Sequence, residues 1–393
     1  MQVAIITGLA PSSRHGSGVQ ILRLFEQRED ASWCLYWAVQ RGVGCEHARA
    51  LRLERPAWFK AWRARRMQRA VLEACGLSWW VGNEVRPGKL RKALTQRGWK
   101  CDVAYITVAT EEDACRAASL VAVLGVPYVV HQMDVPYDDG LDPGVMPGFT
   151  HLLGQAECVL ALSDPIRREV EKFGPRKVEL LSFCQPMTPH RAQRPRPGFP
   201  LRMAIVGSLG GKGNPAMRLL AESWENILAA VGQMECLYMG QDYEALPACL
   251  QRSVRYPGLV SRDQFARERA SCHLAFLPAP SRLDCYARFS LPSRLSDYMA
   301  AGLPVIACVT PGSAAESILY EIGRQAAPIA REPGQLLAEL TRLLEPRAWA
   351  AASDRVLAYA QAHFDGEAAR ERIWSLLRQA CGERSLCAGR VDS

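Results

Sequence analysis

Phe289-Ser-Leu-Pro-Ser-Arg-Leu-Ser-Asp-Tyr-Met-Ala-Ala-Gly-Leu-Pro-Val-Ile-Ala307 contains, in this order, a loop, a short helix, a glycine and a strand. Pro292 fixes φ at a position where a helix can begin. Apolar residues then recur four residues apart, and Gly302 stands where a helix ends in a left-handed conformation. The apolar run that follows Pro304 predicts a buried strand.

The entry into this helix has the chemistry of an anion site. The N–H groups of a helix N-terminus are unpaired and carry a partial positive charge, so they bind an anion directly. Arg294 adds a full charge, and Asp297 lies one turn further in, where its carboxylate can accept hydrogen bonds from sugar hydroxyls. An anion joined to a sugar indicates a nucleotide sugar.

Length and composition indicate a globular protein of two domains. The chain has 393 residues, of which 49% are hydrophobic and 22% charged. No apolar run approaches the roughly 20 residues of a membrane span, and the N-terminus lacks the pattern of a signal peptide. We therefore expect a cytoplasmic protein or one attached to the inner face of a membrane. The 14 cysteines form no Cys-x-x-Cys pair, which favours buried thiols over a zinc site.

Short apolar runs alternate with helical patterns along both halves of the chain. Strands are predicted at residues 3–7, 33–39, 103–107, 127–131 and 159–162, and again at 203–206, 234–239, 254–256, 274–277 and 305–307. This alternation predicts an α/β fold with parallel sheets. The proline-rich segment 184–200 is the candidate linker, which gives domains at 1–190 and 191–380. Residues 350–380 are expected to be helical with a break near Gly366, and residues 381–393 to form a loose tail.

The quoted stretch resembles the donor-binding signature of retaining glycosyltransferases with the GT-B architecture, especially glycosyltransferase family 4. The residues that match are Pro292, Ser293, Arg294, Asp297, Met299, Ala300, Gly302, Pro304 and Val305. The resemblance implies two Rossmann-like domains facing each other across an interdomain cleft. It also implies that the last helix crosses back to the first domain, which receives the acceptor.

A glycine-rich turn follows the first strand of each half, at residues 8–18 and 207–213. Read alone, such a cluster is either a plain turn or a cradle for an anion. The resemblance implies the cradle, with Gly16, Gly18, Gly207 and Lys212 at the sugar and diphosphate. It further assigns Leu291 and Ser293 to the donor, and Leu259 and Val260 to its nucleobase.

The chain also departs from the family pattern at two positions. Ser208 and Phe289 stand where relatives usually carry arginine and glutamate, respectively. Lys212 and Arg294 would then neutralise the diphosphate, and the identity of the sugar is left open.

His131 ends an apolar strand, at the edge of the sheet where open α/β proteins bind ligands. The resemblance implies a catalytic role beside the reacting sugar, whereas the alternative is a histidine that caps the strand by bonding backbone. Asp134, Asp138 and Asp139 suggest a metal site only superficially, because adjacent acids in a Pro/Gly loop usually form a solvated turn. We expect no metal or other cofactor.

Positive charge is concentrated in residues 41–100, where fifteen Lys/Arg and four Asp/Glu give 15 − 4 = +11, against +8 for the whole chain. Residues 55–69 mix arginines with Trp58, Phe59 and Trp62, a composition typical of segments that bind anionic lipid headgroups. A solvated face and a nucleic-acid surface are the alternatives, and the resemblance favours the membrane.

Taken with the resemblance, the sequence predicts a glycosyltransferase that moves a sugar, with retention, from a nucleotide diphosphate sugar to a sugar or lipid-linked acceptor in polysaccharide or glycolipid assembly. Two other classes fit the same features. One is a nucleotide-sugar epimerase of the same fold, and the other is a non-catalytic basic binding or partner protein. Transfer or hydrolysis of a labelled nucleotide sugar separates the three.

Overall fold

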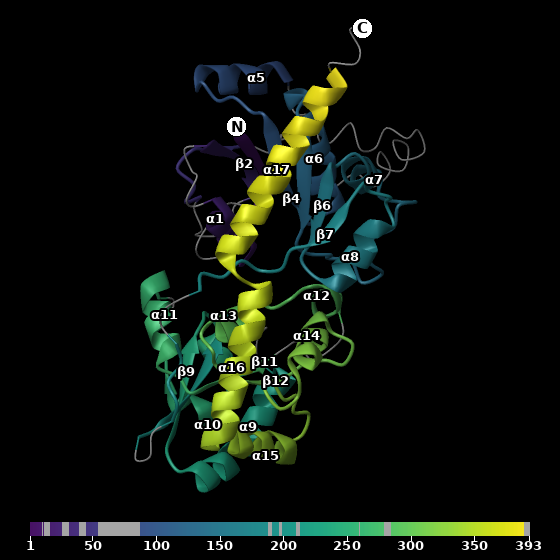
Figure 1. Cartoon of the computed structure of the whole chain (residues 1–393). Coiled ribbons are helices and arrows are strands. Elements are labelled where there is room, and N and C mark those ends of the chain that lie inside the picture. Colours follow the sequence, from purple (N-terminus) through teal and green to yellow (C-terminus); the bar gives the residue numbers. More distant parts are fainter. Residues whose placement is uncertain are drawn as a thin grey trace. The chain divides into compact units, whose positions relative to one another are not determined.

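The computed structural model describes residues 1–9, 11, 16–25, 31–38, 45–53, 87–187, 191–195, 199–209, 213–258, 260–278 and 284–388. The chain divides into two compact units (Figure 1). Unit 1 comprises Met1–Ser182 together with Glu367–Ser393, and unit 2 comprises Phe183–Gly366. Each unit is an α/β structure on its own parallel sheet, so the chain has two Rossmann-like domains, as the sequence predicts.

Within the described residues, the sheet of unit 1 has seven parallel strands in the order β3-β2-β1-β4-β5-β6-β7. The strands are β1 Val3–Leu9, β2 Ser32–Ala38, β3 Ala50–Arg52, β4 Val103–Val108, β5 Tyr128–Gln132, β6 Cys158–Ala161 and β7 Val178–Leu180. The helices are α1 Gly16–Phe25, α5 Pro87–Gln96, α6 Glu111–Leu124, α7 Pro147–Gly154 and α8 Asp164–Glu171. Strands β4 and β5 are buried along their whole length, which explains their unbroken apolar runs.

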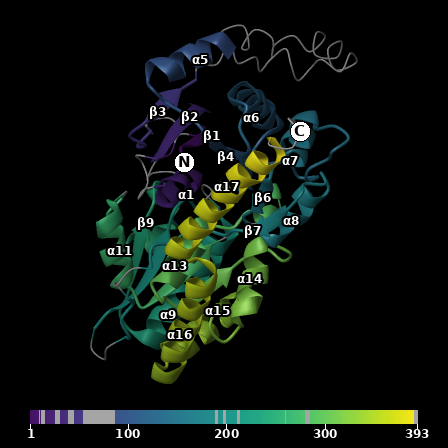
Figure 2. The ribbon, with the colours of Figure 1, turned by 45° about the horizontal axis from the view of Figure 1, so that its top comes forward.

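The C-terminal helix α17 (Gly366–Ala388) belongs to unit 1, and Figures 1 and 2 both show it beside α1. Trp374 packs edge-on against Phe25 of α1, with ring centroids 5.9 Å apart. Arg372 donates two hydrogen bonds, of 2.8 and 2.6 Å, to the carboxylate of Glu179. Apolar packing and a bidentate ion pair thus hold this helix on the unit where the chain began.

The sheet of unit 2 has five parallel strands among the described residues, in the order β10-β9-β8-β11-β12. The strands are β8 Leu201–Val206, β9 Met234–Met239, β10 Val254–Arg255, β11 Leu274–Pro278 and β12 Val305–Cys308. The helices are α9 Pro215–Val231, the 3-10 turn Tyr243–Ala245, α10 Ala248–Gln251, α11 Arg262–Ala270, α12 Cys285–Phe289, α13 Ser293–Ala300, α14 Ala314–Ile322, α15 Pro333–Leu344 and α16 Pro346–His363.

The strand order marks where each sheet can bind a ligand. In unit 2 the chain moves outward from β8 to β9 and β10, and then resumes on the other side of β8 with β11 and β12. The loops leaving β8 and β11 therefore diverge at the carboxyl edge, which is the topological switch point where open α/β sheets bind ligands. In unit 1 the same reversal lies between β1 and β4.

All ten strands predicted from sequence are confirmed, each within two residues at its ends. Strands β3 and β7 were not predicted, because each has only three residues and neither is fully buried. The units divide at Phe183 and Glu367, whereas we expected domains at 1–190 and 191–380. A helix break near Gly366 is confirmed, since α16 ends at His363. Helix α17 continues to Ala388, into the segment expected to be a loose tail, because residues 383–388 contain neither glycine nor proline.

Candidate functional site

The turn after β8 lies at the switch point of unit 2 and begins with Gly207. Its φ of 81° is in the left-handed region, which explains the need for glycine. The Gly207 N–H donates to the carbonyl of Met239 at the end of β9 (2.8 Å). On the other side, the Val206 N–H donates to the hydroxyl of Tyr298 on α13 (2.8 Å), so two elements fix the backbone of this turn.

Arg294, in the first turn of α13, reaches the same turn from the far side of the strand. Its Nη1 donates to the carbonyl oxygens of Val206 (3.0 Å) and Ser208 (2.8 Å). Burial lowers the pKa of Arg294, but from a starting value so high that the guanidinium keeps its charge. In the part of the chain that the structure describes, no carboxylate lies within ion-pair distance of it. A positive charge is thus held at the edge of β8, and none of the described carboxylates pairs with it.

The N-terminus of α13 lies beside this charge, and the first N–H groups of a helix carry a partial positive charge. Pro292 is the N-cap and has no side-chain oxygen to accept hydrogen bonds from the first turn. The hydroxyl of Ser296 donates to the carbonyl of Ser293 (2.7 Å), and Leu291 is buried. The structure therefore brings Gly207, Leu291, Ser293 and Arg294 together at one edge, where a helix terminus and a guanidinium can bind an anion.

Asp242, which the sequence reasoning missed, orders the rest of the turn. Its carboxylate accepts hydrogen bonds from the Ser208 hydroxyl (2.6 Å) and the Leu209 N–H (3.0 Å). Its own N–H donates to the hydroxyl of Tyr238 (3.0 Å), which in turn donates to the carbonyl of Gly207 (3.1 Å). Ser208 stands where relatives carry arginine, and its hydroxyl thus links the turn to the loop that follows β9.

Three tyrosine rings form a wall next to this turn. Tyr256 stacks on Tyr238 with ring centroids 5.6 Å apart and an interplanar angle of 15°, and the ring centroid of Tyr243 lies 4.7 Å from that of Tyr256. The Tyr256 hydroxyl donates to the carbonyl of Gly240 (3.1 Å). These rings come from β9 and the loops that follow β9 and β10, so spacing along the chain gave no sign of them.

Asp297 faces a cation of the protein itself. Its carboxylate accepts a hydrogen bond from Nη1 of Arg269 at 3.4 Å, and the two side chains are only 13% and 4% exposed. The Arg269 guanidinium also lies over the ring of Phe265, 5.2 Å from its centroid. The sequence predicted that Asp297 binds sugar hydroxyls, but it did not predict this ion pair, because Arg269 lies on α11, outside the motif. Phe289, at the position of the usual glutamate, is buried at the end of α12.

In unit 1, His131 is buried at the end of β5, with both ring nitrogens hydrogen-bonded. Nε2 lies 3.1 Å from the carbonyl of Leu181, which can only accept, so Nε2 carries the proton. Nδ1 then accepts from the hydroxyl of Tyr105 (2.7 Å). Burial lowers the pKa of His131 to about 4, so the ring is neutral. The bond to the Leu181 carbonyl is the contact expected of the alternative, a histidine that caps the strand by bonding backbone. The catalytic role of His131 stays a prediction.

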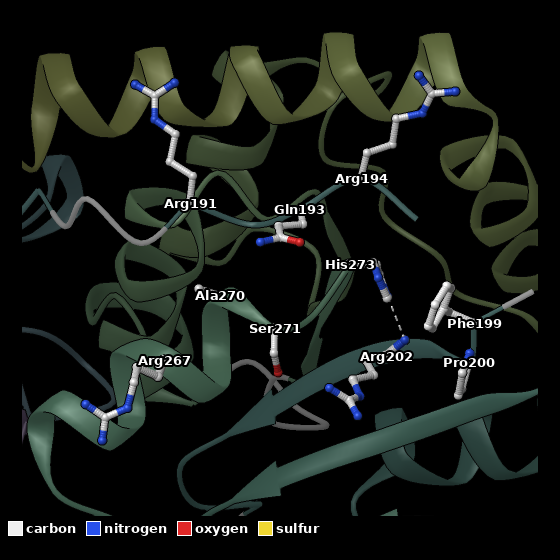
Figure 3. A pocket seen from close by; sticks show the side chains of 10 residues that line it. All are labelled: Arg191, Gln193, Arg194, Phe199, Pro200, Arg202, Arg267, Ala270, Ser271 and His273. Atoms are coloured by element: carbon white, nitrogen blue, oxygen red, sulfur yellow. Dashed lines mark hydrogen bonds between the residues drawn. The ribbon is translucent and has the colours of Figure 1, made fainter. Parts of the chain in front are cut away.

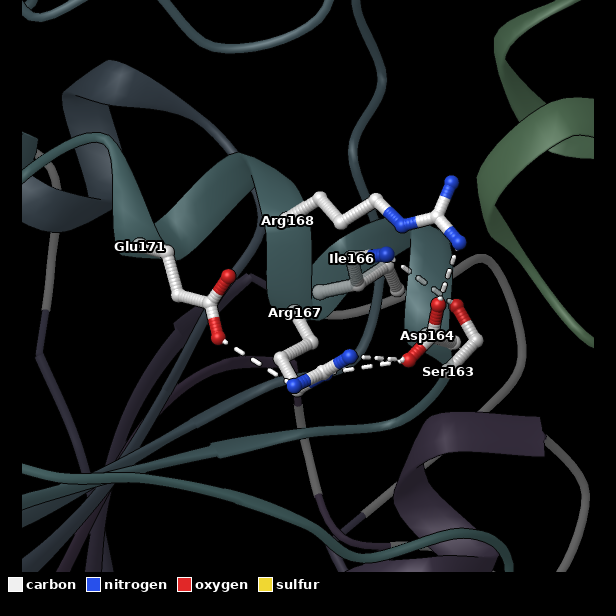
Figure 4. A network of polar contacts seen from close by, with 6 residues as sticks. All are labelled: Ser163, Asp164, Ile166, Arg167, Arg168 and Glu171. Carbon is white, nitrogen blue, oxygen red and sulfur yellow. Dashed lines mark hydrogen bonds and ion pairs between the residues drawn. The ribbon is translucent and has the colours of Figure 1, made fainter.

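The carboxyl edge of the first sheet also carries a charged helix start (Figure 4). The Ser163 hydroxyl accepts from the Ile166 N–H (3.3 Å) and caps α8. Arg167 (2.7 Å) and Arg168 (2.8 Å) pair with Asp164 in the first turn. Burial alone raises the pKa of Asp164, but the two guanidinium groups bring it below its ordinary value overall. This network satisfies its own charges and leaves Arg168 largely exposed.

The remaining predicted positions lie in unit 1, elsewhere in unit 2 or outside the described residues. Gly16 and Gly18 open α1 after β1 and, like His131, belong to unit 1. Val260 is half-buried just before Ser261, the N-cap of α11. Lys212, Leu259 and residues 55–69 lie outside the described residues.

Comparison with known protein families gives a match within the second unit. Residues 200–346 match the family described as "Glycosyl transferases group 1". That range covers the whole β8 to β12 sheet and the edge described above. The sequence gave no significant match among curated proteins.

The whole chain resembles solved structures of glycosyltransferases in fold. Anabaena HepE in complex with UDP and glucose has a TM-score of 0.65 at 13% identity, covering 96% of this chain and 100% of its own. Sucrose-phosphate synthase from Thermosynechococcus elongatus has a TM-score of 0.64 at 12% identity, covering 96% and 99%. Trehalose 6-phosphate synthase from Burkholderia multivorans has a TM-score of 0.59 at 13% identity, covering 98% of each chain.

The fold is therefore that of the GT-B glycosyltransferases, and residues 200–346 are similar to the group 1 glycosyltransferase model. Among the described helices, none combines the length and the apolar character needed to cross a membrane.

Proposed function

We propose that the protein is a glycosyltransferase that uses a nucleotide diphosphate sugar as donor and a sugar or lipid-linked molecule as acceptor. The observation that carries the proposal is the edge of β8. The left-handed turn at Gly207, the N-terminus of α13 and the guanidinium of Arg294 meet there with no carboxylate within ion-pair distance of that guanidinium among the described residues. Such a combination suits the diphosphate of a leaving nucleotide.

The comparisons support the donor class. The group 1 glycosyltransferase domain contains this edge, and Anabaena HepE, similar in fold, has been solved with UDP-glucose. When a glycosidic bond to a diphosphate breaks, negative charge develops on the departing phosphate oxygen. Arg294, with Lys212 from the same turn, would stabilise that charge, so we propose that no metal ion or other cofactor is required.

The finer features of the proposal follow the family resemblance. They are transfer with retention as in glycosyltransferase family 4, a role in polysaccharide or glycolipid assembly, and peripheral attachment to the inner face of a membrane through residues 55–69. Asp297, which pairs with Arg269, would also contact sugar hydroxyls of the donor. Leu259 and Val260 would contact the nucleobase. Gly16, Gly18 and His131 would contribute from unit 1.

Calorimetry with nucleoside diphosphates tests the donor site. The proposal expects one nucleoside diphosphate to bind with an affinity that falls in both Arg294→Ala and Lys212→Ala. Unchanged affinity in both variants would refute the assignment of the diphosphate to this edge.

A non-catalytic binding protein is the second candidate, and a specific observation favours it. Phe289, where the family uses a carboxylate against sugar hydroxyls, is buried and apolar. A binding protein would hold the nucleotide sugar without consuming it. Release of labelled sugar to water or to an acceptor separates the two candidates.

A further inference from the structure

A cationic cavity lies in unit 2, at the opposite edge of the sheet from Gly207. Its volume is about 550 Å³, and Figure 3 shows the residues that line it: Arg191, Gln193, Arg194, Phe199, Pro200, Arg202, Arg267, Ala270, Ser271 and His273. Arg202 stands at the start of β8 and His273 directly before β11, so the cavity opens at the amino edge. Strand β8 spans about 20 Å, which separates this cavity from the turn after its carboxyl end.

The charge of the cavity is strongly positive. Of the described residues that line it, four are arginines and none is acidic. Arg202 pairs with Glu235 at 2.7 Å. In the part of the chain covered by the structure, Arg191, Arg194 and Arg267 have no carboxylate within ion-pair distance. The cavity therefore keeps an excess of three positive charges.

The cavity has a fixed frame. The Ala192 N–H donates to the carbonyl of Ala301 at the end of α13 (2.8 Å), which holds the segment that carries Arg191 and Arg194. Among the lining residues, Nδ1 of His273 accepts a hydrogen bond from the backbone N–H of Arg202 (2.9 Å). The His273 carbonyl accepts a hydrogen bond from Nε1 of Trp349 (2.5 Å). Burial and the nearby Arg202 charge lower the pKa of His273, so the neutral ring keeps its proton on Nε2 as a hydrogen-bond donor.

The arrangement of the arginines indicates the kind of ligand. In Figure 3, Arg191 and Arg194 extend on one side of the cavity, and Arg202 and Arg267 lie on the other, with Gln193, Ser271 and His273 between them. The guanidinium groups of Arg191 and Arg194 point away from those of Arg202 and Arg267 (Figure 3), so a ligand that pairs with both sides needs at least two anionic groups. Arginine is the residue whose planar fork best matches phosphate oxygens.

Size and apolar surface favour a small molecule over an extended anionic surface. The volume lies in the range of ligand sites, about 300–1,000 Å³. Phe199 is 67% exposed at the rim and offers a ring against which an organic group can pack. We propose that this cavity is a second anion site, which binds a small molecule carrying two or more phosphate groups, apart from the donor site at the carboxyl edge.

Calorimetric titration with inorganic tripolyphosphate at about 0.1 M salt tests the proposal. Arg202→Gln/Arg267→Gln is expected to weaken binding about 100-fold, since each guanidinium–phosphate contact is worth about tenfold or more. Arg252→Gln/Arg324→Gln is the matched control, because it removes the same charge from exposed positions of unit 2 outside the cavity lining and should leave the affinity within about twofold.

Arg294→Ala distinguishes this cavity from the proposed donor site. The cavity predicts that tripolyphosphate still binds this variant and that the Arg202→Gln/Arg267→Gln changes weaken the remaining binding about 100-fold. Loss of all binding in Arg294→Ala, with no effect of the cavity changes, would overturn the inference while leaving the donor site intact. Equal weakening by the matched control, or binding of wild type to anionic vesicles but not to tripolyphosphate, would also overturn it.

Discussion

Arg294 is the residue on which most of the proposed chemistry depends, because it has two tasks. Its Nη1 fastens the turn after β8 through two carbonyl oxygens, and its charge is available to an anion at the same edge. Sequence alone predicted the charge. The fastening could not be predicted, since Val206 and Ser208 lie more than eighty residues earlier in the chain.

Arg294→Ala should weaken nucleoside diphosphate binding by about 1.5–3 kcal/mol, the range for a hydrogen bond to a charged group. Arg294→Lys keeps the charge but loses the guanidinium Nη1 that donates to both carbonyls, so its affinity should fall between those of wild type and the alanine variant. Calorimetry on the three proteins measures this order. Equal affinity of lysine and alanine variants would mean that geometry, not charge, holds the diphosphate.

His131 gives a pH test of its buried state. Its folded-state pKa of about 4 lies below the ordinary 6.5, so between these values the unfolded chain binds the proton and the folded chain does not. The contribution of His131 to stability is therefore constant above pH 6.5 and falls as the pH drops toward 4, by about 2 kcal/mol at pH 5. Urea unfolding of wild type and His131→Gln at pH 7 and pH 5 measures the difference.

The same variant separates the two roles of His131. If the residue acts at the reacting centre, His131→Gln should cut turnover far more than donor affinity at pH 7. Unchanged turnover per folded molecule, together with a lost pH response, would assign it to bracing β5 against Tyr105 and Leu181.

At the scale of elements, β9 and the β8 turn must approach closely at Gly240. A Cβ there would stand 2.5 Å from the Gly207 carbonyl oxygen and 2.3 Å from the Tyr238 hydroxyl. The Gly207 carbonyl belongs to the backbone and cannot rotate away as a flexible side chain can. A Cβ at position 240 would therefore displace the turn after β8.

Gly240→Ala should therefore destabilise the protein by about 1–3 kcal/mol and weaken nucleotide binding at the same time. Gly334→Ala, in the first turn of α15 with open space around it, is the control and should be neutral or slightly stabilising. Thermal unfolding with and without nucleotide reports both effects. A stable Gly240→Ala variant with normal affinity would show that the turn is not held by this contact.

The elements that sequence could predict are the long apolar ones. Ten strands were predicted because their runs are buried in the sheets, whereas β3 and β7 are short and only half-buried. At the site, Arg294 and Gly207 could be predicted because motif and turn are local in sequence. Asp242, Tyr298 and Arg269 could not, since their partners come from strands and helices that meet only in the folded unit.

The basic segment 55–69 carries the prediction of membrane attachment. Each Lys or Arg that reaches anionic headgroups contributes roughly 1 kcal/mol, and salt screens this attraction. Reversal of Arg63, Arg65, Arg66 and Arg69 to glutamate should therefore abolish sedimentation with anionic vesicles and spare transfer to a soluble acceptor analogue. Wild-type protein that ignores such vesicles at low salt but retards nucleic acid would contradict the membrane proposal.

At the scale of the whole molecule, the chain has the GT-B fold, and residues 200–346 are similar to the group 1 glycosyltransferases. The edge of β8 is where we propose that it acts. Many proteins share this fold at identities near 13%, so fold alone does not specify the donor or the acceptor. The chemistry has to be read from the site, where we propose that Arg294 stabilises the leaving diphosphate without a metal ion.

Transfer of label from a panel of radiolabelled nucleotide sugars, with the metal chelator EDTA present, tests the central claim most directly. We predict that wild type releases or transfers sugar from at least one donor in EDTA, and that Arg294→Ala loses this activity by about 10- to 100-fold while staying folded. A wild-type protein that binds a nucleotide sugar and leaves it intact with every donor and acceptor offered would contradict the claim and identify a binding protein.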